Sequence, residues 1–555
     1  MKKFNKFLSV VLAGAMAFSL AACGNETTES AMSSETTAAT STETTLAEPE
    51  VYEVNYPVDT DVKLSIFSQY PVIHEEYETW EQSPYHSTLE KNTGIYVDFQ
   101  IASSIERQTK YNLLWTSELK DMPKMVNNNY AAGELDTLVD EGVVWDLTDY
   151  VQQYAPDYWA YLNAEGNEYL LRSARTEAGR IASVYGFIQN DLCATYIGPV
   201  IRQDWLDECG LKAPVTIEDW ETVLVAFKEK YGVGFGFSLA RFKQGFASGF
   251  GAYTSLYISS NADTLYLDDN GKIQYAAVQP EYKEMLTVLN KWYKMGLIDL
   301  DSFSMNNNQL REKVAAGKIG ATFCSMADLS NFVVDANAEG GTGAKWVGIE
   351  YPRTEAGAPT NWIQTQNLIN IRSTAVTKGA SEEEMIASLQ WLNYGFTEEG
   401  FMYQNFGIEG ESYNVDANGN VEYTDALKNE DGTLNTSSLT KYTGNVSAAI
   451  GGIQAHQNIR LKNNPVAVDA LYKWVENTEV REHFLPAFHV GAEDSATYTD
   501  KMTLINTRAS EMAMKFVVGE ESLDKFDDFV KELESYGLAD CLAIQQKAFD
   551  AYMAK

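Results

Sequence analysis

Histidine and cysteine are scarce in this chain of 555 residues, which holds five of each. No two cysteines have C-x-x-C spacing and no two histidines form H-E-x-x-H, so a zinc site has no support. We expect no metal and no cofactor. A chain of this length buries enough surface to fold without disulfides. We therefore expect buried free thiols, with a Cys193–Cys209 bridge as the less favoured alternative, at Cys193, Cys209, Cys324 and Cys541.

Basic residues are also few. The sequence has 42 Lys and Arg against 78 Asp and Glu, a formal net charge of −36. The Lys and Arg residues are scattered and form no stripe, so this average field would repel a phosphate backbone and argues against nucleic-acid binding. The acidic total itself selects no function, because it is also what keeps a protein surface soluble.

Motifs of common enzyme classes are missing as well. Neither Gly-Lys pair is followed by Ser or Thr, which excludes a P-loop, and the glycine-rich loop at 245–251 does not read G-x-S-x-G. Carboxylate pairs occur throughout an acidic chain, so spacing alone identifies no glycosidase pair. We predict no catalytic residues and no enzymatic activity, with a surface glycan-processing enzyme as a minor alternative.

Long apolar runs are absent except at the N-terminus. Lys2, Lys3 and Lys6 precede a run of 14 mainly apolar or small residues from Phe7 to Leu20. A basic start followed by so short a run predicts a secretory signal over residues 1–22, not a spanning helix. No later run reaches spanning length.

The residues around Cys23 and after it predict an anchor and a tether. Leu20–Gly24 resembles the lipobox of bacterial lipoproteins, which implies that Cys23 becomes the lipidated N-terminus. Two acyl chains would hold the protein stably at the outer face of the cytoplasmic membrane. An ordinary cleaved signal with a chance cysteine is the alternative. Residues 24–50 contain twelve Ser and Thr, six Glu and no aromatic residue, so we interpret 23–50 as the lipidated cysteine and a disordered tether.

The body of the chain alternates strand and helix patterns. Apolar residues recur at every second position in 62–66 and 95–101, a helix that Gly94 ends is expected at 84–93, and a third apolar stretch at 122–126 follows a helix at 107–119. This order predicts a doubly wound, mainly parallel sheet. Ligands bind such sheets outside the carboxyl ends of the strands. The rule points to Tyr70 after the first strand and to the segment Asn127–Tyr130 after the third.

Later segments show clear helix and turn signals. A capping box at Thr216 begins one helix and Pro280 begins another. Residues 381–384 cap a third helix. Helices are also expected at about 521–535 and 540–553. Asp268–Gly271 and Asp416–Gly419 are typical of hairpin turns, and neither is followed by the acidic twelfth residue that a calcium loop requires. Five tryptophans are expected to pack in the core: Trp115, Trp205, Trp220, Trp292 and Trp391.

Four sets of segments resemble the extracellular solute-binding proteins of bacterial ABC importers, and in particular their large carbohydrate-binding lipoprotein branch. The sets follow the order of the family and cover nearly the whole chain after residue 50. These are Leu119–Pro123 with Trp145–Tyr150 and Tyr154–Pro156; Ile201–Leu206 with Gly210–Leu211 and Pro214–Thr216; Pro280–Lys283 with Gly296–Asp299 and Ala316–Gly320; and Phe406–Gly410 with Tyr413 and Gly519–Leu538. Lys124 departs from the pattern, because the family commonly has an acidic residue there.

The resemblance implies an α/β fold of the periplasmic-binding-protein type, with two doubly wound lobes joined by three hinge crossovers near 185–201, 319–325 and 394–402. The first lobe would comprise 51–190 plus 322–398, and the second 191–321 plus 399–555. The implied function is capture of an oligosaccharide between the lobes and its delivery to the transmembrane subunits of an ABC permease, by a monomer that meets the membrane through its lipid anchor only. A receptor for a peptide or polyamine is the main alternative.

Candidate ligand-binding residues lie in the expected loops. Aromatic rings can stack on the C–H faces of sugars, while amides and carboxylates can pair with hydroxyls. Each candidate also has a structural interpretation, as a turn residue, a core ring or a solvated acid. They are Tyr70, Asn127, Asn128, Tyr130, Arg202, Phe250, Tyr253, Ser325, Trp362, Glu409, Glu411 and Tyr413.

Overall fold

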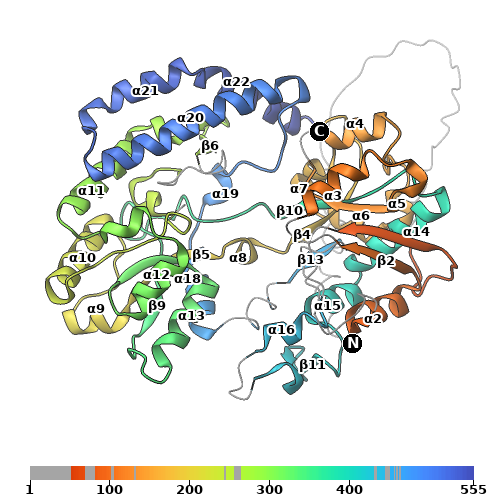
Figure 1. Cartoon of the computed structure of the whole chain (residues 1–555), viewed down its shortest axis with the longest axis horizontal. Helices are drawn as coiled ribbons and strands as arrows, with labels where there is room; N and C mark the ends of the chain where they lie inside the picture. The colour runs from red at the N-terminus through yellow and green to blue at the C-terminus, as the bar shows by residue number, and fades with distance from the viewer. Residues whose placement is uncertain are drawn as a thin grey trace, which may run out of the picture. The chain divides into compact units, whose positions relative to one another are not determined.

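The computed structural model describes residues 52–68, 82–101, 106–130, 133–242, 245–254, 264–429, 434–443, 451–455, 457, 461 and 464–555. The expected signal, the lipidation site at Cys23, the tether and the candidate Tyr70 lie outside these residues. Residues 52–555 form one compact unit (Figure 1).

A six-stranded sheet carries the first strands of the chain. Its order is β13-β4-β10-β3-β1-β2. The strands are β1 (Lys63–Ser68), β2 (Tyr96–Ile101), β3 (Met125–Asn128), β4 (Val184–Ile188), β10 (Ile369–Val376) and β13 (Gly452–Gln454). β1 pairs in parallel with both β2 and β3, as the alternating pattern predicts. β10 is antiparallel to β3 and β4, which makes the sheet mixed.

The helix between β1 and β2 begins and ends as predicted. α2 (Pro84–Thr93) has proline in its first turn, and Gly94 caps it with a φ of 75°. A side chain at Gly94 would meet the carbonyl oxygen of Val58, so only glycine fits this left-handed position. α3 (Arg107–Leu114) is shorter than the predicted helix at 107–119.

Helices α4 to α7, α14 and α15 contribute to the packing of this part of the fold. They are α4 (Glu134–Asp140), α5 (Val151–Tyr154), α6 (Pro156–Leu162), α7 (Glu168–Ala174), α14 (Glu382–Asn393) and α15 (Glu398–Phe406). Ile66, Met125 and Phe187 from the sheet join Trp391 from α14 in one buried cluster. Burying apolar surface stabilises a folded chain by about 25 cal/mol per Å², so this cluster contributes to the stability of the sheet and of the helices packed on it.

A second, three-stranded sheet has the order β8-β5-β9, with every pairing antiparallel. Its strands are β5 (Ile197–Arg202), β8 (Ala321–Ser325) and β9 (Trp346–Gly348). The helices of this region are α9 (Gln203–Cys209), α10 (Ile217–Tyr231), α11 (Pro280–Lys294), α12 (Asn307–Ala315), α13 (Met326–Asn337), α18 (Pro465–Val475), α20 (Ala492–Val518), α21 (Phe526–Ser535) and α22 (Leu538–Met553). The predicted capping box of α10 is present at Thr216 and Asp219. Trp205, Trp220 and Trp292 are core residues, as predicted.

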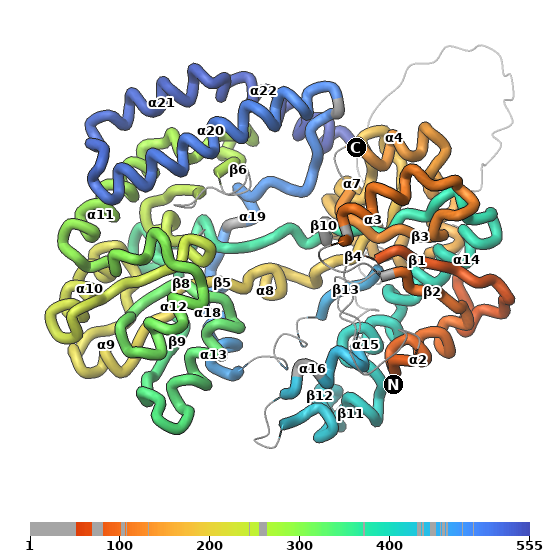
Figure 2. The backbone as a smooth tube through the Cα atoms, in the orientation of Figure 1, coloured from red at the N-terminus to blue at the C-terminus, as the bar shows by residue number. Residues whose placement is uncertain are grey.

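Three connections join the two sheets. The chain passes from β4 through α8 (Asp191–Ala194) to β5, as Figure 2 traces; from β9 to β10; and from β13 to α18. The first agrees with the crossover expected at 185–201. The positions expected at 319–325 and 394–402 are wrong. Residues 321–325 form β8, which pairs with β5, and α15 contacts β13 of the six-stranded sheet.

The expected lobe boundaries also disagree with the observed strand pairing at β8, β9 and β13. β8 and β9 fall within 322–398 apart from one residue, yet they pair with β5 and not with the six-stranded sheet. β13 falls within 399–555, yet it pairs with β4. The hydrogen-bonding partner of a short buried strand lies far away in the sequence, so the local pattern could not identify it. The division into two lobes stays a prediction.

Both predicted hairpin turns are confirmed. β6 (Leu265–Leu267) pairs with β7 (Ile273–Tyr275), and β11 (Tyr413–Val415) pairs with β12 (Val421–Tyr423). In each turn an aspartate, Asp268 or Asp416, accepts hydrogen bonds from the backbone N–H groups two and four residues ahead. These carboxylates therefore close turns. Within the described ranges, no group of three or more His, Cys, Asp and Glu residues is arranged to hold a metal ion.

The cysteines that the structure describes are free thiols. Cys193, Cys324 and Cys541 are buried, and Cys209 is half-buried. Burial raises the pKa of the Cys193 thiol to about 11, which keeps it protonated and unreactive near neutral pH. Among the helices in the described ranges, none combines the length and the apolar character that a membrane crossing needs.

Candidate functional site

The carboxyl ends of β1 and β3 form a buried polar edge. Ser68 and Asn127 are partners in the parallel register. The Asn127 amide donates to Oγ1 of Thr374 on β10 at 3.0 Å, while Ser68 Oγ and Asn127 Oδ1 have no hydrogen-bond partner among the described residues. Buried polar atoms without a partner are uncommon and need an explanation. This edge is where ligands approach sheets of this type.

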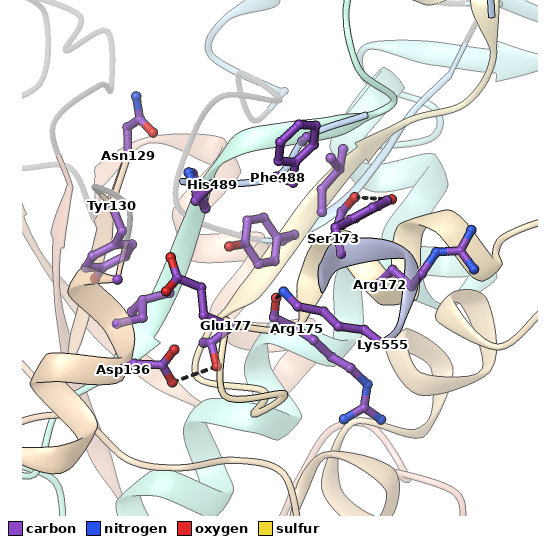
Figure 3. Close-up of a pocket in the computed structure, with 17 residues that line it drawn as sticks. Asn129, Tyr130, Asp136, Arg172, Ser173, Arg175, Glu177, Phe488, His489 and Lys555 are labelled. Atoms are coloured by element: carbon purple, nitrogen blue, oxygen red, sulfur yellow. Dashed lines mark hydrogen bonds between the residues drawn. The ribbon is translucent and has the colours of Figure 1, made fainter. Parts of the chain in front are cut away.

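A cavity of about 100 Å³ lies beyond this edge, next to the segment that follows β3 (Figure 3). Four aromatic rings contribute to its wall: Tyr130, Tyr185, Phe488 and Tyr552. Polar and charged side chains complete much of the rest: Asn129, Asp136, Arg172, Ser173, Arg175, Thr176, Glu177, His489 and Lys555. A wall of this composition offers flat apolar faces together with hydrogen-bond donors and acceptors, which is what a polyhydroxylated ligand needs.

Tyr130 is fixed in the wall by its own strand. Its hydroxyl donates to the carbonyl oxygen of Val126 at 2.7 Å, and its side chain is 6% exposed. Burial raises the pKa of this phenol well above its ordinary value, so it stays neutral and remains a donor.

The turn after α7 carries Glu177 and is held by Asp136 of α4. The Asp136 carboxylate accepts from Oγ1 of Thr176 at 2.7 Å and from the backbone N–H of Ala178 at 3.0 Å. It also forms an ion pair with Arg180 at 3.5 Å. These bonds bracket Glu177 on both sides and fix its backbone at the rim of the cavity.

The end of the C-terminal helix α22 closes another side of the cavity. The Tyr552 hydroxyl lies 3.1 Å from Ser173 Oγ and donates to the carbonyl oxygen of Tyr169 at 3.0 Å. The Lys555 ammonium donates to the carbonyl oxygen of Arg175 at 3.1 Å. Both contacts are with α7 or its C-cap, so the last residues of the chain are part of this site.

A second cavity of about 130 Å³ adjoins the first. The two share five lining residues: Glu177, Phe488, His489, Tyr552 and Lys555. The second is otherwise lined by the beginning of α20 and by α22, including the ion pairs of Lys547 with Glu493 and Asp494. Because they share these residues, we treat the two neighbouring cavities together as the candidate site.

Of the predicted ligand residues that the structure describes, a set that leaves out Tyr70, only Tyr130 is in this lining. Asn127 and Asn128 lie just before it on β3, buried at the polar edge, while Asn129, which was not predicted, lines the cavity. Lys124, where the chain departs from the family pattern, forms an ion pair with Glu384 at 3.0 Å. It therefore stabilises the start of α14.

Arg202 and Ser325 both bond to neighbouring aspartates, so their role as ligand residues stays a prediction. The Arg202 guanidinium donates to both Asp204 oxygens at 2.8 and 2.5 Å and lies 4.6 Å from the ring of Trp205. Ser325 caps α13: its hydroxyl accepts from the N–H of Asp328 and donates to that carboxylate. Neither residue lines the cavity.

The predicted aromatic candidates of the second region form a cluster of their own. The Tyr253 ring stacks on Tyr266 with centroids 4.5 Å apart and meets the edge of Trp362. Trp362 is 0% exposed and Phe250 is 9% exposed, so both are core residues, which corrects the expectation that Trp362 offers a face to a ligand. Tyr253 is half-buried, and its hydroxyl is 3.2 Å from Nε2 of His483.

The last predicted group is also separate from the cavity. Tyr413 on β11 is 5% exposed and packs against Phe406, in a small core of its own. Glu409 and Glu411 are exposed on the preceding turn. This arrangement matches the solvated-loop interpretation of the two carboxylates.

Sequence reasoning missed most of the lining. Glu177, Phe488, His489, Tyr552 and Lys555 belong to a turn, a connecting segment and the end of a helix. No local motif marks them, and they come together only because α22 reaches α7. The tyrosine content of 32 residues indicated a supply of rings but not their positions.

Comparisons with known proteins agree with this fold. Residues 74–400, more than half of the chain, match the family described as bacterial extracellular solute-binding protein. Lipoprotein LipO of Bacillus subtilis (strain 168) is 26% identical over 347 residues, which cover 60% of this chain and 65% of LipO, just under two thirds of its length.

Two other similarities cover more of the chain. The fructooligosaccharide ABC transporter substrate-binding protein FusA of Streptococcus pneumoniae serotype 4 (strain ATCC BAA-334 / TIGR4) is 24% identical over 490 residues, 84% of this chain and 86% of FusA. The polygalacturonan/rhamnogalacturonan-binding protein YtcQ of Bacillus subtilis (strain 168) is 22% identical over 492 residues, 85% of this chain and 91% of YtcQ.

A solved structure of S. pneumoniae FusA in complex with kestose superposes with a TM-score of 0.64 at 20% identity, covering 89% of this chain and all of that one. The fold is therefore of the periplasmic-binding-protein type. With the family match over more than half its length, the chain belongs to the bacterial extracellular solute-binding proteins.

Proposed function

We propose that this chain is a lipid-anchored receptor that captures an oligosaccharide and delivers it to an ABC permease. The observation that carries the proposal is the lining of the cavity, where four aromatic rings occur together with carboxylate, ammonium and hydroxyl groups next to the segment that follows β3. The names of FusA and YtcQ, both saccharide-binding proteins, support the same ligand class.

The size of the cavity bears on how the ligand would enter. At about 100 Å³ the cavity is smaller than the roughly 300–1,000 Å³ that is usual for ligand pockets. We infer that the ligand binds a more open arrangement, and that its contacts then favour closure through their differential affinity. Two lobes, each built on one sheet, would move about the three connections between the sheets.

The N-terminal segment supplies the other half of the proposal. A lipid on Cys23 and a tether through residue 50 would keep the receptor close to its permease in the membrane. The similarity to LipO, which is named a lipoprotein, supports this location. No bond of the ligand is broken in the proposed role, so the saccharide should be released unchanged.

Calorimetric titration of the purified chain lacking residues 1–22 tests the ligand class. The panel holds neutral and acidic oligosaccharides, short peptides and polyamines, with chromatography of each saccharide before and after incubation. Saturable binding of an intact saccharide supports the proposal. Binding confined to peptides or polyamines would favour the alternative receptor, and shortened saccharides would show an enzyme.

A further inference from the structure

Ser68 and Asn127 carry two buried polar atoms that have no partner. Ser68 is the last residue of β1, and Asn127 is its partner on β3 in the parallel register. Ser68 is 1% exposed and Asn127 is 4% exposed, and neither Ser68 Oγ nor Asn127 Oδ1 forms a hydrogen bond with any residue that the structure describes. Since most buried polar atoms in proteins are paired, these two atoms point to an occupant from outside the chain.

The contacts of Asn127 determine which of its side-chain atoms is left over. Its Nδ2 donates to Oγ1 of Thr374 at 3.0 Å and to the carbonyl oxygen of Ser373 at 3.4 Å. The free atom is therefore the amide oxygen, which only accepts, while the Ser68 hydroxyl can both donate and accept. Neighbouring strands lie about 4.8 Å apart, and paired positions share a face, so one atom placed between the two side chains can reach both.

The same face of the sheet is apolar before this point. Ile66 and Met125 lie two residues earlier on the same strands and belong to the buried cluster that contains Trp391. Side chains two apart in a strand point to the same face, so Ser68 and Asn127 continue these apolar rows with polar groups. Two buried polar atoms cost stability unless something binds them. Packing alone therefore does not account for them.

The pair is close in sequence to the lining of the cavity. Neither Ser68 nor Asn127 lines it, but Asn129 and Tyr130 do, and they follow Asn127 by two and three residues. Consecutive residues of one strand end thus lead from the pair to the cavity wall. A ligand that extends from the cavity along this edge would bring one of its groups to the pair.

We propose that Ser68 and Asn127 form a subsite for one hydroxyl group of the bound saccharide. That hydroxyl donates its hydrogen to Asn127 Oδ1 and accepts the hydrogen of the Ser68 hydroxyl, which satisfies both atoms at once. An ether oxygen or a C–H group in its place would satisfy at most one of them. Both atoms are covered in this structure, so the ligand hydroxyl enters in the more open arrangement through which the ligand binds.

A single water molecule has the same chemistry as the proposed hydroxyl, and two polar partners are enough to hold one. A saccharide hydroxyl would then displace it. The experiment below separates the two occupants, because only a ligand hydroxyl links Ser68 to affinity. The inference rests on the proposed function, since it concerns the ligand of that same protein.

The test compares Ser68→Ala with Ser388→Ala. Both variants remove a buried serine hydroxyl, but that of Ser388, on α14, donates to the carbonyl oxygen of Glu384 at 2.7 Å. Kestose and oligogalacturonates are titrated calorimetrically into the wild-type chain and both variants, followed by the monodeoxy analogues of the saccharide that binds most tightly. Urea denaturation gives the free energy of unfolding of each protein without ligand.

The two variants should show opposite patterns. Ser68→Ala should bind the saccharide about tenfold more weakly with no loss of stability, because its hydroxyl has a partner only when the ligand is bound. Ser388→Ala should lose stability and keep its affinity, because its hydroxyl bonds within the folded chain. Unchanged affinity in Ser68→Ala would overturn the inference and leave the proposed function standing. If stability also falls in that variant, the occupant is a buried water.

One monodeoxy analogue should identify the ligand hydroxyl. The wild-type chain should bind it about a hundredfold more weakly than the parent saccharide, because Ser68 and Asn127 both lose their partner. In Ser68→Ala the same analogue should lose only about tenfold, since one of the two bonds is already absent. Equal losses in both proteins for every analogue would overturn the inference. Absence of binding to every saccharide would overturn the proposed function as well.

Discussion

Asp136 and Thr176 are joined by a hydrogen bond of 2.7 Å from the threonine hydroxyl to the carboxylate, across 40 residues of sequence. The same hydroxyl accepts from the backbone N–H of Arg180 at 3.2 Å. One side chain thus links α4 to the turn after α7. Because Glu177 is the next residue, the bond also holds its backbone at the rim of the cavity.

Thr176→Val should loosen this turn without changing its volume. We expect the free energy of unfolding to fall by about 1 kcal/mol, since two hydrogen bonds are lost from a half-buried hydroxyl, and ligand affinity to fall several-fold. Urea denaturation and calorimetry measure the two effects. Thr137→Val is the matched control, because Thr137 is exposed on α4 and its hydroxyl bonds only to Gly133 of the same turn. Equal losses of stability and of ligand affinity in the two variants would contradict the role of Thr176 in holding the turn.

Tyr552→Phe tests the attachment of α22 to α7. The variant keeps the ring in the cavity wall and removes the hydroxyl that reaches Ser173 and Tyr169. A loss of about 1 kcal/mol in the free energy of unfolding is expected. Tyr472→Phe, whose ring is 47% exposed, should leave stability unchanged. Backbone hydrogen exchange at residues 549–555 should be faster in Tyr552→Phe and unchanged in Tyr472→Phe. Unchanged exchange in Tyr552→Phe would contradict the attachment of α22 to α7 through this hydroxyl.

Gly198→Ala tests the packing of β5 against α18. A Cβ atom at this position would lie 2.4 Å from ring atoms of Trp474, whose Nε1 donates to the carbonyl oxygen of the neighbouring Pro199. Because the indole is held by that bond, we expect a loss of about 3 kcal/mol or more, measured by urea denaturation. At Gly491 the nearest atom is 4.0 Å from the added Cβ, so Gly491→Ala should be tolerated. A stable Gly198→Ala protein would show that the indole can move.

Local patterns predicted the elements that local physics determines. The bounds of α2 follow from Pro84 and Gly94, and the strands β1 and β2 follow from their alternation. The sheet partner of β8 could not be predicted this way. Its five residues are all buried, and a buried run carries no sign of which strands it will pair with.

The residues of the candidate site were even harder to predict from local sequence patterns. Tyr130 could be predicted, because it follows a strand at the carboxyl edge of a parallel sheet. Phe488 and Tyr552 could not, because Tyr552 bonds to residues of α7 more than 300 positions earlier and Phe488 packs against Tyr552. Trp362 was misassigned for a related reason: a polar neighbour, Asn361, marks a loop in the sequence but says nothing about what covers the indole.

The proposed lipid anchor depends on Cys23. We expect the wild-type chain to fractionate with membranes and to incorporate a labelled fatty acid, because two acyl chains anchor a protein stably. Cys23→Ala should lose the label, and any processed protein should appear in the medium or periplasm. Cys193→Ala is the matched control, since it removes a buried thiol from the folded body. A Cys23→Ala protein that is processed normally and stays on the membrane would contradict the anchor.

His86 should make stability depend on pH. Its side chain is 6% exposed, its Nδ1 lies 2.8 Å from Ser83 Oγ, and burial lowers the pKa of the imidazole from 6.5 to about 2. The unfolded chain therefore binds a proton below pH 6.5 that the folded chain does not. Stability from this group is present above that pH and is lost as the pH falls, by about 1.4 kcal/mol per unit.

Urea denaturation at pH 8.5, 7.5 and 5.5 measures this dependence. The wild-type chain should lose about 1.4 kcal/mol more than His86→Gln between pH 7.5 and 5.5, because glutamine takes up no proton there. Between pH 8.5 and 7.5 the two proteins should change in parallel, which serves as the internal control. The comparison uses the change in the free energy of unfolding with pH, so it holds even if the substitution lowers that free energy by a constant amount at every pH. Parallel slopes below pH 6.5 would mean that the folded protein also protonates His86, by opening the contact between α2 and β2.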